Sequence, residues 1–339
     1  MTAAKRYVEI MDTTLRDGEQ TSGVSFSPSE KLTIAQLLLT EVKVDRIEIA
    51  SARVSEGEFK AVKAITRWAK TNGYLNRVEV LTFVDGDVSV QWTVKAGAKV
   101  MNLLTKGSLN HLTHQLKKKP EQHFREVADV IALAKKKGLE CNVYLEHWSN
   151  GMRHSKDYVF RYLDFLRKQP VKRIMLPDTL GVLVPSEVRD YVAEIVGRYP
   201  DIHFDLHTHN DYDLGTANVL EGVISGARGV HLTINGMGER AGNTPLASAI
   251  AVLNDFAPNV KTSVVEEALY RVSKLVETFS GFRIPANKPV VGENVFTQTA
   301  GIHADGDKKN KLYFSDLMPE RFGRQRKYAL GKTSGKASN

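Results

Sequence analysis

Short runs of apolar and β-branched residues alternate with longer amphipathic stretches through most of the chain. Eight of these runs have the length and composition of buried strands, at residues 7–14, 45–50, 77–84, 99–105, 139–147, 171–179, 203–209 and 229–235. Stretches with the 3.6-residue period of a helix lie between them, for example at 29–41, 57–72, 120–137, 158–168 and 185–198. Eight strands that each precede a helix predict an α/β fold, a closed parallel (β/α)₈ or TIM barrel.

Prolines and glycines agree with these boundaries. Pro28 and Pro185 stand where a first-turn proline is expected, and Gly73, Gly138 and Gly226 stand where helices should stop. No GxGxxG or phosphate-loop motif follows a predicted strand, which counts against a nucleotide-binding open sheet.

The chain continues beyond the predicted barrel, which we assign to residues 1–258. A long helix is expected at 262–280, followed by a loop-rich segment at 281–307 that contains Pro285, Pro289 and Gly292. Residues 259–339 are therefore predicted to form an appendage made of a linker helix and a small subdomain.

Composition limits the classes of protein to consider. The 339 residues carry a formal charge of +8, and 42% of them are hydrophobic, which suffices for a barrel of roughly 250 residues. No apolar run has the length of a membrane span and no signal-peptide pattern begins the chain, so we expect a cytoplasmic protein with no membrane partner. Lysine clusters at 117–119, 135–137 and 308–309 lack the interleaved aromatic residues typical of nucleic-acid binding. The single cysteine, Cys141, excludes an internal disulfide and is expected to be a buried strand residue.

The first candidate for chemistry is a pair of motifs at predicted strand ends. Arg16 and Asp17 follow the first strand, and His207 and His209 end the seventh. The two histidines are separated by one residue, so they point to the same face of their strand. Barrel enzymes place their chemistry at the carboxyl ends of the strands. One carboxylate and two imidazoles there predict a divalent metal site with open positions for a substrate.

Other polar residues fall at the same predicted face. Glu146 ends the fifth strand, Thr179 ends the sixth, and the polar loop 235–243 follows the eighth. Each has a purely structural alternative: Thr179 could cap the next helix, Glu146 could be a solvated carboxylate, and Tyr144 could be ordinary barrel packing.

Three motifs together carry a resemblance to a known family. They are Leu15-Arg16-Asp17-Gly18-Glu19-Gln20 followed after ten residues by Lys31, then His207-x-His209-Asn210-Asp211, and then Asn235-Gly236-x-Gly238-Glu239-Arg240-x-Gly242-Asn243. Over nearly its whole length the chain resembles the α-isopropylmalate, homocitrate and citramalate synthases, which are metal-dependent acyl-CoA condensing enzymes. One departure is Asp213, which stands where the family usually has glycine, so we expect the next helix to start differently.

The resemblance implies a metal centre that holds an α-keto acid. Asp17, His207 and His209, with Asn243 as a fourth ligand, would bind Zn, Mn or Mg, and the metal would chelate the carboxylate and keto oxygens of the substrate. Arg16 would stabilise the alkoxide that forms on the keto oxygen.

The remaining roles concern the two substrates. Thr179 would hydrogen-bond the keto-acid carboxylate. Glu146, with His303 of the motif Gly301-Ile302-His303-Ala304, would remove a proton from the methyl group of the co-substrate acetyl-CoA. The enolate then attacks the ketone and water hydrolyses the thioester. In the family the appendage reaches over a neighbouring barrel, which implies a homodimer.

Residues at the ends of the third to fifth strands bear on the choice of keto acid. Leu81, Leu104 and Tyr144 are expected to form the pocket wall, and Gln20 and Phe83 to contribute to it. Homocitrate synthases carry arginine at the position of Asn142, and common isopropylmalate synthases carry serine at Tyr144 and histidine at Leu81.

Tyr144 would therefore occupy the space that an isopropyl group needs. Two extra methyl groups gain only about 1.6 kcal/mol on burial, whereas overpacking costs about 1–3 kcal/mol. The pattern favours pyruvate, which would give (R)-citramalate for isoleucine synthesis. The alternative is a 2-isopropylmalate synthase that acts on 2-oxoisovalerate in leucine synthesis.

Other classes fit the sequence less well. A Schiff-base aldolase would need a strand-end lysine, for which Lys106 is the one candidate, and a CoA-ester lyase would be expected to have a loop cysteine, unlike Cys141. A binding scaffold would not fill every metal and base position. Family members often carry a C-terminal regulatory domain, and because residues 331–339 are basic with almost no apolar side chains, we expect that domain to be absent here and the chain to be insensitive to isoleucine and leucine.

Overall fold

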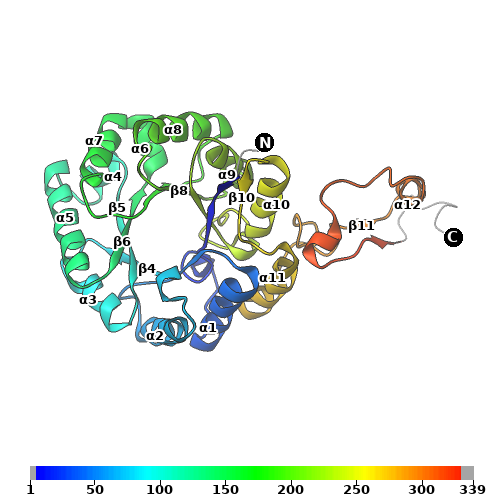
Figure 1. Ribbon diagram of the computed structural model, residues 1–339, viewed down its shortest axis with the longest axis horizontal. Coiled ribbons are helices and arrows are strands. Elements are labelled where there is room, and N and C mark those ends of the chain that lie inside the picture. The colour runs from blue at the N-terminus through cyan, green and yellow to red at the C-terminus, as the bar shows by residue number, and fades with distance from the viewer. Residues whose placement is uncertain (1–4, 330–339) are drawn as a thin grey trace.

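Eight parallel strands close into a barrel in this computed structural model, which describes residues 5–329 (Figure 1). The strands follow one another around the barrel in sequence order: β2 (Glu9–Asp12), β3 (Arg46–Ser51), β4 (Val78–Phe83), β5 (Val100–Lys106), β6 (Glu140–Glu146), β7 (Ile174–Asp178), β8 (Phe204–Thr208) and β9 (Gly229–Leu232). The predicted TIM barrel is confirmed. The first and last strands are shorter than their apolar runs, because the residues that follow Asp12 and Leu232 turn into the loops of the barrel face.

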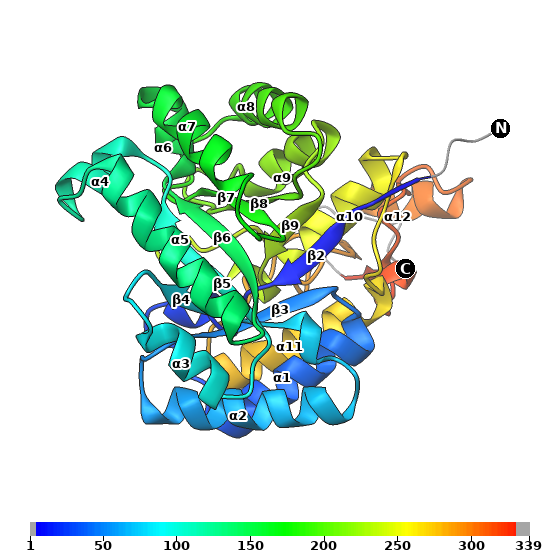
Figure 2. The ribbon, with the colours of Figure 1, turned by 60° about the vertical axis from the view of Figure 1, so that its left-hand side comes forward.

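Helices surround the barrel on its outside, as Figure 2 shows. They are α1 (Pro28–Leu37), α2 (Glu56–Thr71), α3 (Val88–Lys95), α4 (Leu109–His114), α5 (Pro120–Lys136), α6 (Trp148–His154), α7 (Lys156–Leu166), α8 (Pro185–Arg198), α9 (Gly215–Ile224) and α10 (Leu246–Phe256). Ser27 and Glu30 form a capping box around Pro28 at the start of α1. The predicted glycine stops have positive φ angles, for example 80° at Gly73 and 72° at Gly138. Among residues 5–329, no helix is both long and apolar enough to span a bilayer.

The helix expected at 262–280 begins later, at Glu266, and forms α11 (Glu266–Ser280). The preceding Val260–Lys261 instead forms a short strand, β10, which pairs with β1 (Arg6–Tyr7). Helix α11 packs on the barrel through Leu269, Val272 and Val276, which are buried.

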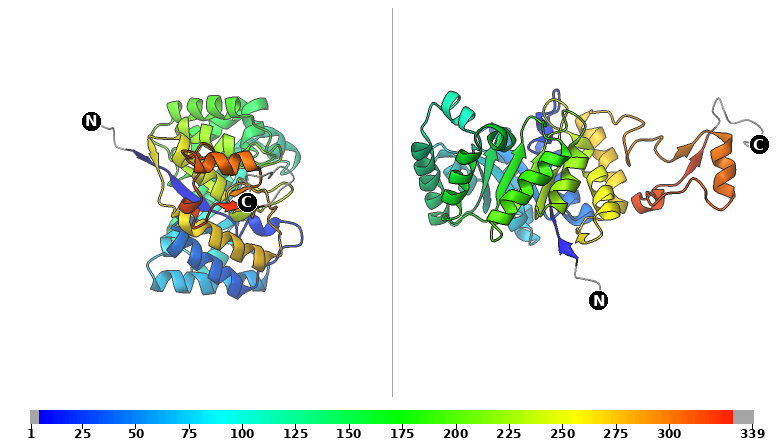
Figure 3. Two further views of the ribbon diagram at one scale, coloured as in Figure 1. Left: turned by 90° about the vertical axis from the view of Figure 1, so that its right-hand side faces the viewer. Right: turned by 90° about the horizontal axis from the view of Figure 1, so that it is seen from above.

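Beyond α11 the chain extends away from the barrel (Figure 3). This part contains β11 (Thr297–Gln298), α12 (Gly301–Lys308) and β12 (Lys327–Tyr328), with β11 and β12 paired in parallel. Arg321 connects it to the barrel side, with its Nη1 2.7 Å from Asp255 Oδ1 and its Nη2 2.7 Å from Glu266 Oε1. The boundary at residue 258 and the reach of the appendage toward a partner stay predictions, and the expected loss of a regulatory domain rests on residues 331–339, which lie outside the described part.

The interior of the barrel is more polar than the branched aliphatic filling that is usual for this fold. Arg46, Glu79 and Asp205 are all buried inside it. Arg46 Nη1 lies 3.0 Å from Glu79 Oε1, and its Nη2 forms an ion pair with Asp205. Buried charges persist only when they are paired, so these side chains hold one another in fixed positions.

Candidate active site

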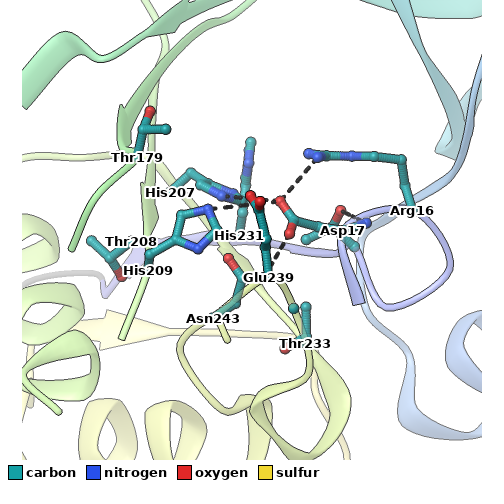
Figure 4. Close-up of polar contacts among 12 residues, drawn as sticks. Arg16, Asp17, Thr179, His207, Thr208, His209, His231, Thr233, Glu239 and Asn243 are labelled. Carbon is teal, nitrogen blue, oxygen red and sulfur yellow. Dashed lines mark hydrogen bonds and ion pairs between the residues drawn. The ribbon is translucent and has the colours of Figure 1, made fainter. Parts of the chain in front are cut away.

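Asp17, His207 and His209 converge at the carboxyl face of the barrel (Figure 4). Asp17 lies in the loop after β2, His207 lies on β8, and His209 follows that strand. One ligand atom from each lies within 4.8 Å of the others, and the two Nε2 atoms are 3.4 and 4.0 Å from Asp17 Oδ2. All three side chains are buried. The two strand-end motifs thus meet in space as expected, and the metal remains a prediction.

Asn243 adds a fourth oxygen to this group. Its Nδ2 donates to Asp17 Oδ1 at 3.0 Å and to the Met237 carbonyl at 3.1 Å, which leaves Oδ1 buried without a hydrogen-bond partner among the described residues. Two imidazole nitrogens, a carboxylate and an amide oxygen are a donor set that suits Zn, Mn or Mg. The residues therefore fit a divalent metal.

Two positions of the loop motif require glycine for steric reasons. A Cβ atom at Gly238 would lie 2.2 Å from Asn243 Nδ2, and one at Gly242 would lie 1.9 Å from the Gly236 carbonyl oxygen. Both glycines also have positive φ angles, 152° and 83°. Only glycine lets this loop bring Asn243 against Asp17.

The surroundings of Asp17 and His209 keep the carboxylate ionised and the imidazole neutral. Burial opposes ionisation of Asp17, but Arg16 and the neighbouring histidines hold the pKa of that carboxyl well below its usual range. Burial lowers the pKa of His209 to about 4, so its imidazole stays in the neutral form that can bind a metal.

Arg16 is fixed by two carboxylates and keeps one nitrogen available. Its Nη1 lies 2.9 Å from Asp17 Oδ2 and its Nε lies 2.5 Å from Glu48 Oε2. The Nη2 atom has no hydrogen-bond partner within residues 5–329. Burial opposes its charge, yet the carboxylates of Glu48 and Asp17 raise the pKa of Arg16 above its usual value. The Arg16 guanidinium is thus a cation held in a fixed position, and its Nη2 can still donate a hydrogen bond to a ligand.

A cavity of about 220 Å³ lies beside these residues. The predicted site residues that line it are Arg16, Asp17, Gln20, Leu81, Phe83, Leu104, Tyr144, Glu146, Thr179, His207 and His209. Sequence reasoning missed Ser51 and Pro177, and it quoted Glu239 in a motif without giving it a role. Ser51 ends β3, so its place at a strand end was the signal that could have identified it.

Thr179 and Glu146 are positioned by neighbouring strands. Thr179 Oγ1 accepts a hydrogen bond of 2.9 Å from the backbone N–H of His147, and helix α8 starts only at Pro185, so Thr179 does not cap that helix. Glu146 forms an ion pair with Lys106 at the end of β5. Lys106 does not line the cavity, so the structure gives no support to a Schiff-base lysine.

His303 lies far from this cavity within one chain. It belongs to α12 in the extended appendage (Figures 1 and 3). Its Nδ1 is 3.2 Å from Gln298 Oε1, and its ring packs on Tyr313 with 4.2 Å between the ring centroids. Its predicted catalytic role would therefore need the barrel of a second copy and stays a prediction.

Asp213 stands where related enzymes usually have glycine, and we expected the next helix to start differently there. Asp213 has a φ of 58°, the left-handed conformation that glycine favours, and its carboxylate accepts a 3.0 Å hydrogen bond from Asn210. The backbone therefore keeps a glycine-like shape at this position.

Cys141 is buried on β6, where burial raises the pKa of its thiol to about 12, so it is not a reactive loop cysteine.

Comparison with known proteins assigns the chain to a family. Residues 7–276 match the HMGL-like family, and residues 290–338 match the family described as homocitrate synthase post-HMGL domain-like. The chain therefore belongs to the HMGL-like family, in the group of isopropylmalate, homocitrate and citramalate synthases, and the resemblance seen in the sequence is confirmed.

Individual relatives lie within this group. The chain is 36% identical over 334 residues to the 2-isopropylmalate synthase of Sulfurisphaera tokodaii, covering 97% of the chain and 83% of the relative. It is 35% identical over 329 residues to the (R)-citramalate synthase of Methanocaldococcus jannaschii, covering 97% of the chain and 65% of the relative. The chain spans 63–66% of the length of the citramalate synthases that it matches.

A solved structure shares the fold. The HMG-CoA lyase of Bacillus subtilis superposes with a TM-score of 0.71 at 21% identity, covering 84% of this chain and 97% of the lyase.

Proposed function

We propose that this chain condenses acetyl-CoA with an α-keto acid, and that pyruvate is the preferred keto acid, giving (R)-citramalate and free CoA. The observation that supports pyruvate is the apolar part of the cavity wall, where Leu81, Leu104 and Tyr144 line the same cavity as the metal-binding side chains. A cavity of about 220 Å³ is below the range of roughly 300–1,000 Å³ for drug-sized ligands.

Tyr144 limits the size of the keto-acid side chain. It is only 2% exposed, and it packs with Leu81, Met11 and Met175 in one buried cluster. A branched substrate has two more methyl groups than pyruvate, and the ~1.6 kcal/mol gained by burying them is matched or exceeded by an overpacking cost of about 1–3 kcal/mol.

The polar side of the cavity would bind the other end of the keto acid. A divalent metal held by Asp17, His207, His209 and Asn243 would supply Lewis acidity and orient the substrate oxygens. The free Nη2 of Arg16 would donate to the keto oxygen as it gains negative charge. The hydroxyl of Thr179, which accepts from the His147 N–H, keeps its own proton to donate to the substrate carboxylate.

Glu146 would act as the base. Its carboxylate lines the cavity and is held by Lys106, so it is oriented before acetyl-CoA binds. It removes a proton from the acetyl methyl group, the resulting carbanion forms a carbon–carbon bond with the keto carbon, and the oxyanion takes up a proton. Water then cleaves the thioester and releases CoA as a thiol. We further propose that two copies of the chain assemble so that His303 of each reaches the other's site.

The direct test is a panel of keto acids with acetyl-CoA, in which release of free thiol is followed. Pyruvate is expected to have the highest kcat/KM among pyruvate, 2-oxobutanoate, 2-oxoisovalerate and 2-oxoglutarate. A higher value for 2-oxoisovalerate would make the chain a 2-isopropylmalate synthase, like its relative in Sulfurisphaera tokodaii. Thiol release that does not require any keto acid would contradict condensation altogether.

A further inference from the structure

A line of buried hydrogen bonds continues from the cavity wall into the barrel interior. The hydroxyl of Tyr144 lies 3.0 Å from His231 Nδ1, and His231 Nε2 lies 3.0 Å from Asp205 Oδ2. His231 and Asp205 are completely buried, and neither lines the cavity. Such a polar line is unusual where aliphatic side chains normally fill the barrel, so it calls for a physical explanation.

Asp205 is held at the inner end of this line. The guanidinium of Arg46 forms an ion pair with the same Oδ2 atom that contacts His231. A Cβ atom at position 229 would lie 2.1 Å from Asp205 Oδ1, so Gly229 is needed to make room for the carboxylate. Gly229 and His231 are two residues apart on β9 and face the same side of it. One strand therefore supplies both the space for Asp205 and the imidazole that contacts it.

His231 connects the carboxylate to the phenol. Because an ionised carboxylate only accepts hydrogen bonds, Nε2 is the donor to Asp205, which fixes the ring and turns Nδ1 toward Tyr144. The Tyr144 ring stands edge-on to His231, with 5.5 Å between centroids and an interplanar angle of 81°. The other neighbour of the hydroxyl, Glu48 Oε2, is farther away at 3.4 Å and already accepts from Thr13 and Arg16.

We infer that Asp205 and His231 are positioning residues that set keto-acid selectivity, because they hold Tyr144 in the orientation that closes the apolar side of the cavity. This inference rests on the proposed function. A buried phenol that lost this partner would carry an unsatisfied hydroxyl and would move to find another one. A ring that lacked the hydroxyl would lose the hydrogen bond to His231 that fixes its orientation. The ring would then vacate part of the wall, and the cavity would accept longer side chains although no lining residue had changed.

The test compares kcat/KM for 2-oxobutanoate with that for pyruvate in four variants of the full chain. His231→Leu removes both hydrogen bonds at similar volume, and Tyr144→Phe removes only the hydroxyl. Both should raise the ratio by about threefold or more. This is less than the roughly 10- to 200-fold that a fully accommodated methylene is worth, because the displaced ring vacates only part of the wall. The double variant should show no further increase, because both changes break the same contact. His231→Gln, which can still donate and accept, should return the ratio toward the native value.

A matched control is His123→Leu, which removes another buried histidine, on α5, that does not contact Tyr144. It should leave the ratio unchanged. An unchanged ratio in folded His231→Leu, with kcat lowered equally for all keto acids, would overturn the inference, as would additive effects in the double variant. If His231→Leu does not fold, an unchanged ratio in Tyr144→Phe overturns it in the same way. Failure of the proposed function is seen separately, in the native enzyme's own preference within the keto-acid panel.

Discussion

Replacing Tyr144 by serine tests the selectivity argument most directly. The substitution removes a ring that is 2% exposed and packs against Leu81, Met11 and Met175. Large-to-small changes of buried aromatic residues cost about 3–5 kcal/mol of stability. Here the new space joins the existing cavity of about 220 Å³, so water or substrate can fill it and the cost should fall at the lower end.

The effect on substrate choice follows from the same volume. One methylene that gains a fitting place in a pocket is worth about 1–3 kcal/mol, so Tyr144→Ser should raise kcat/KM for 2-oxobutanoate relative to pyruvate roughly tenfold or more. The ratio for 2-oxoisovalerate should rise as well, because the vacated ring leaves room for a branched group. The assay is thiol release from acetyl-CoA with each keto acid, on protein whose thermal unfolding is measured in parallel.

A buried tyrosine elsewhere provides the matched control. Tyr199 is 1% exposed and lies at the end of α8, outside the cavity, so Tyr199→Ser should lower stability by a similar mechanism without changing the ratio. An unchanged ratio in folded Tyr144→Ser would refute the assignment of the pocket wall and with it the preference for pyruvate.

Three further predictions concern the metal centre and its surroundings. His207→Ala should abolish both activity and metal binding while the barrel still unfolds cooperatively; full metal stoichiometry by elemental analysis would contradict the ligand set. Arg16→Lys should lower kcat by about 10²–10³-fold, because one ammonium cannot pair with both carboxylates and also donate to the oxyanion; a kcat within threefold of native would argue against that role. Burial raises the pKa of Asp12 to about 7 from its ordinary 3.8, so the folded chain holds a proton that the unfolded chain releases. The free energy of unfolding should therefore decrease as the pH rises from about 4 to about 7, and Asp12→Asn should flatten that dependence in denaturant titrations.

Much of the site could be predicted from the sequence because its information is local. The alternation of strand and helix patterns predicted the barrel. Because the strands of such a barrel are parallel, their carboxyl ends meet at one face. The two-residue spacing of His207 and His209 places both imidazoles on one side of the chain at the end of β8. Asp17 follows β2, which is separated from β8 in the barrel by β9 alone. Residues chosen in this way line one cavity, including the apolar residues Leu81 and Leu104.

Only the tertiary structure decided how these residues are supported. The ion pair of Lys106 with Glu146 joins β5 to β6, and the contact of His231 with Tyr144 joins β9 to β6. The fold also leaves Oδ1 of Asn243 buried with no hydrogen-bond partner among residues 5–329. Such pairings depend on the register between strands and on which side chains share a layer inside the barrel, and neither is encoded in the period of a single strand. The position of His303 was likewise decided by the tertiary structure. Its motif is visible in the sequence, but the packing of α11 and the contacts of Arg321 set the direction in which the appendage leaves the barrel.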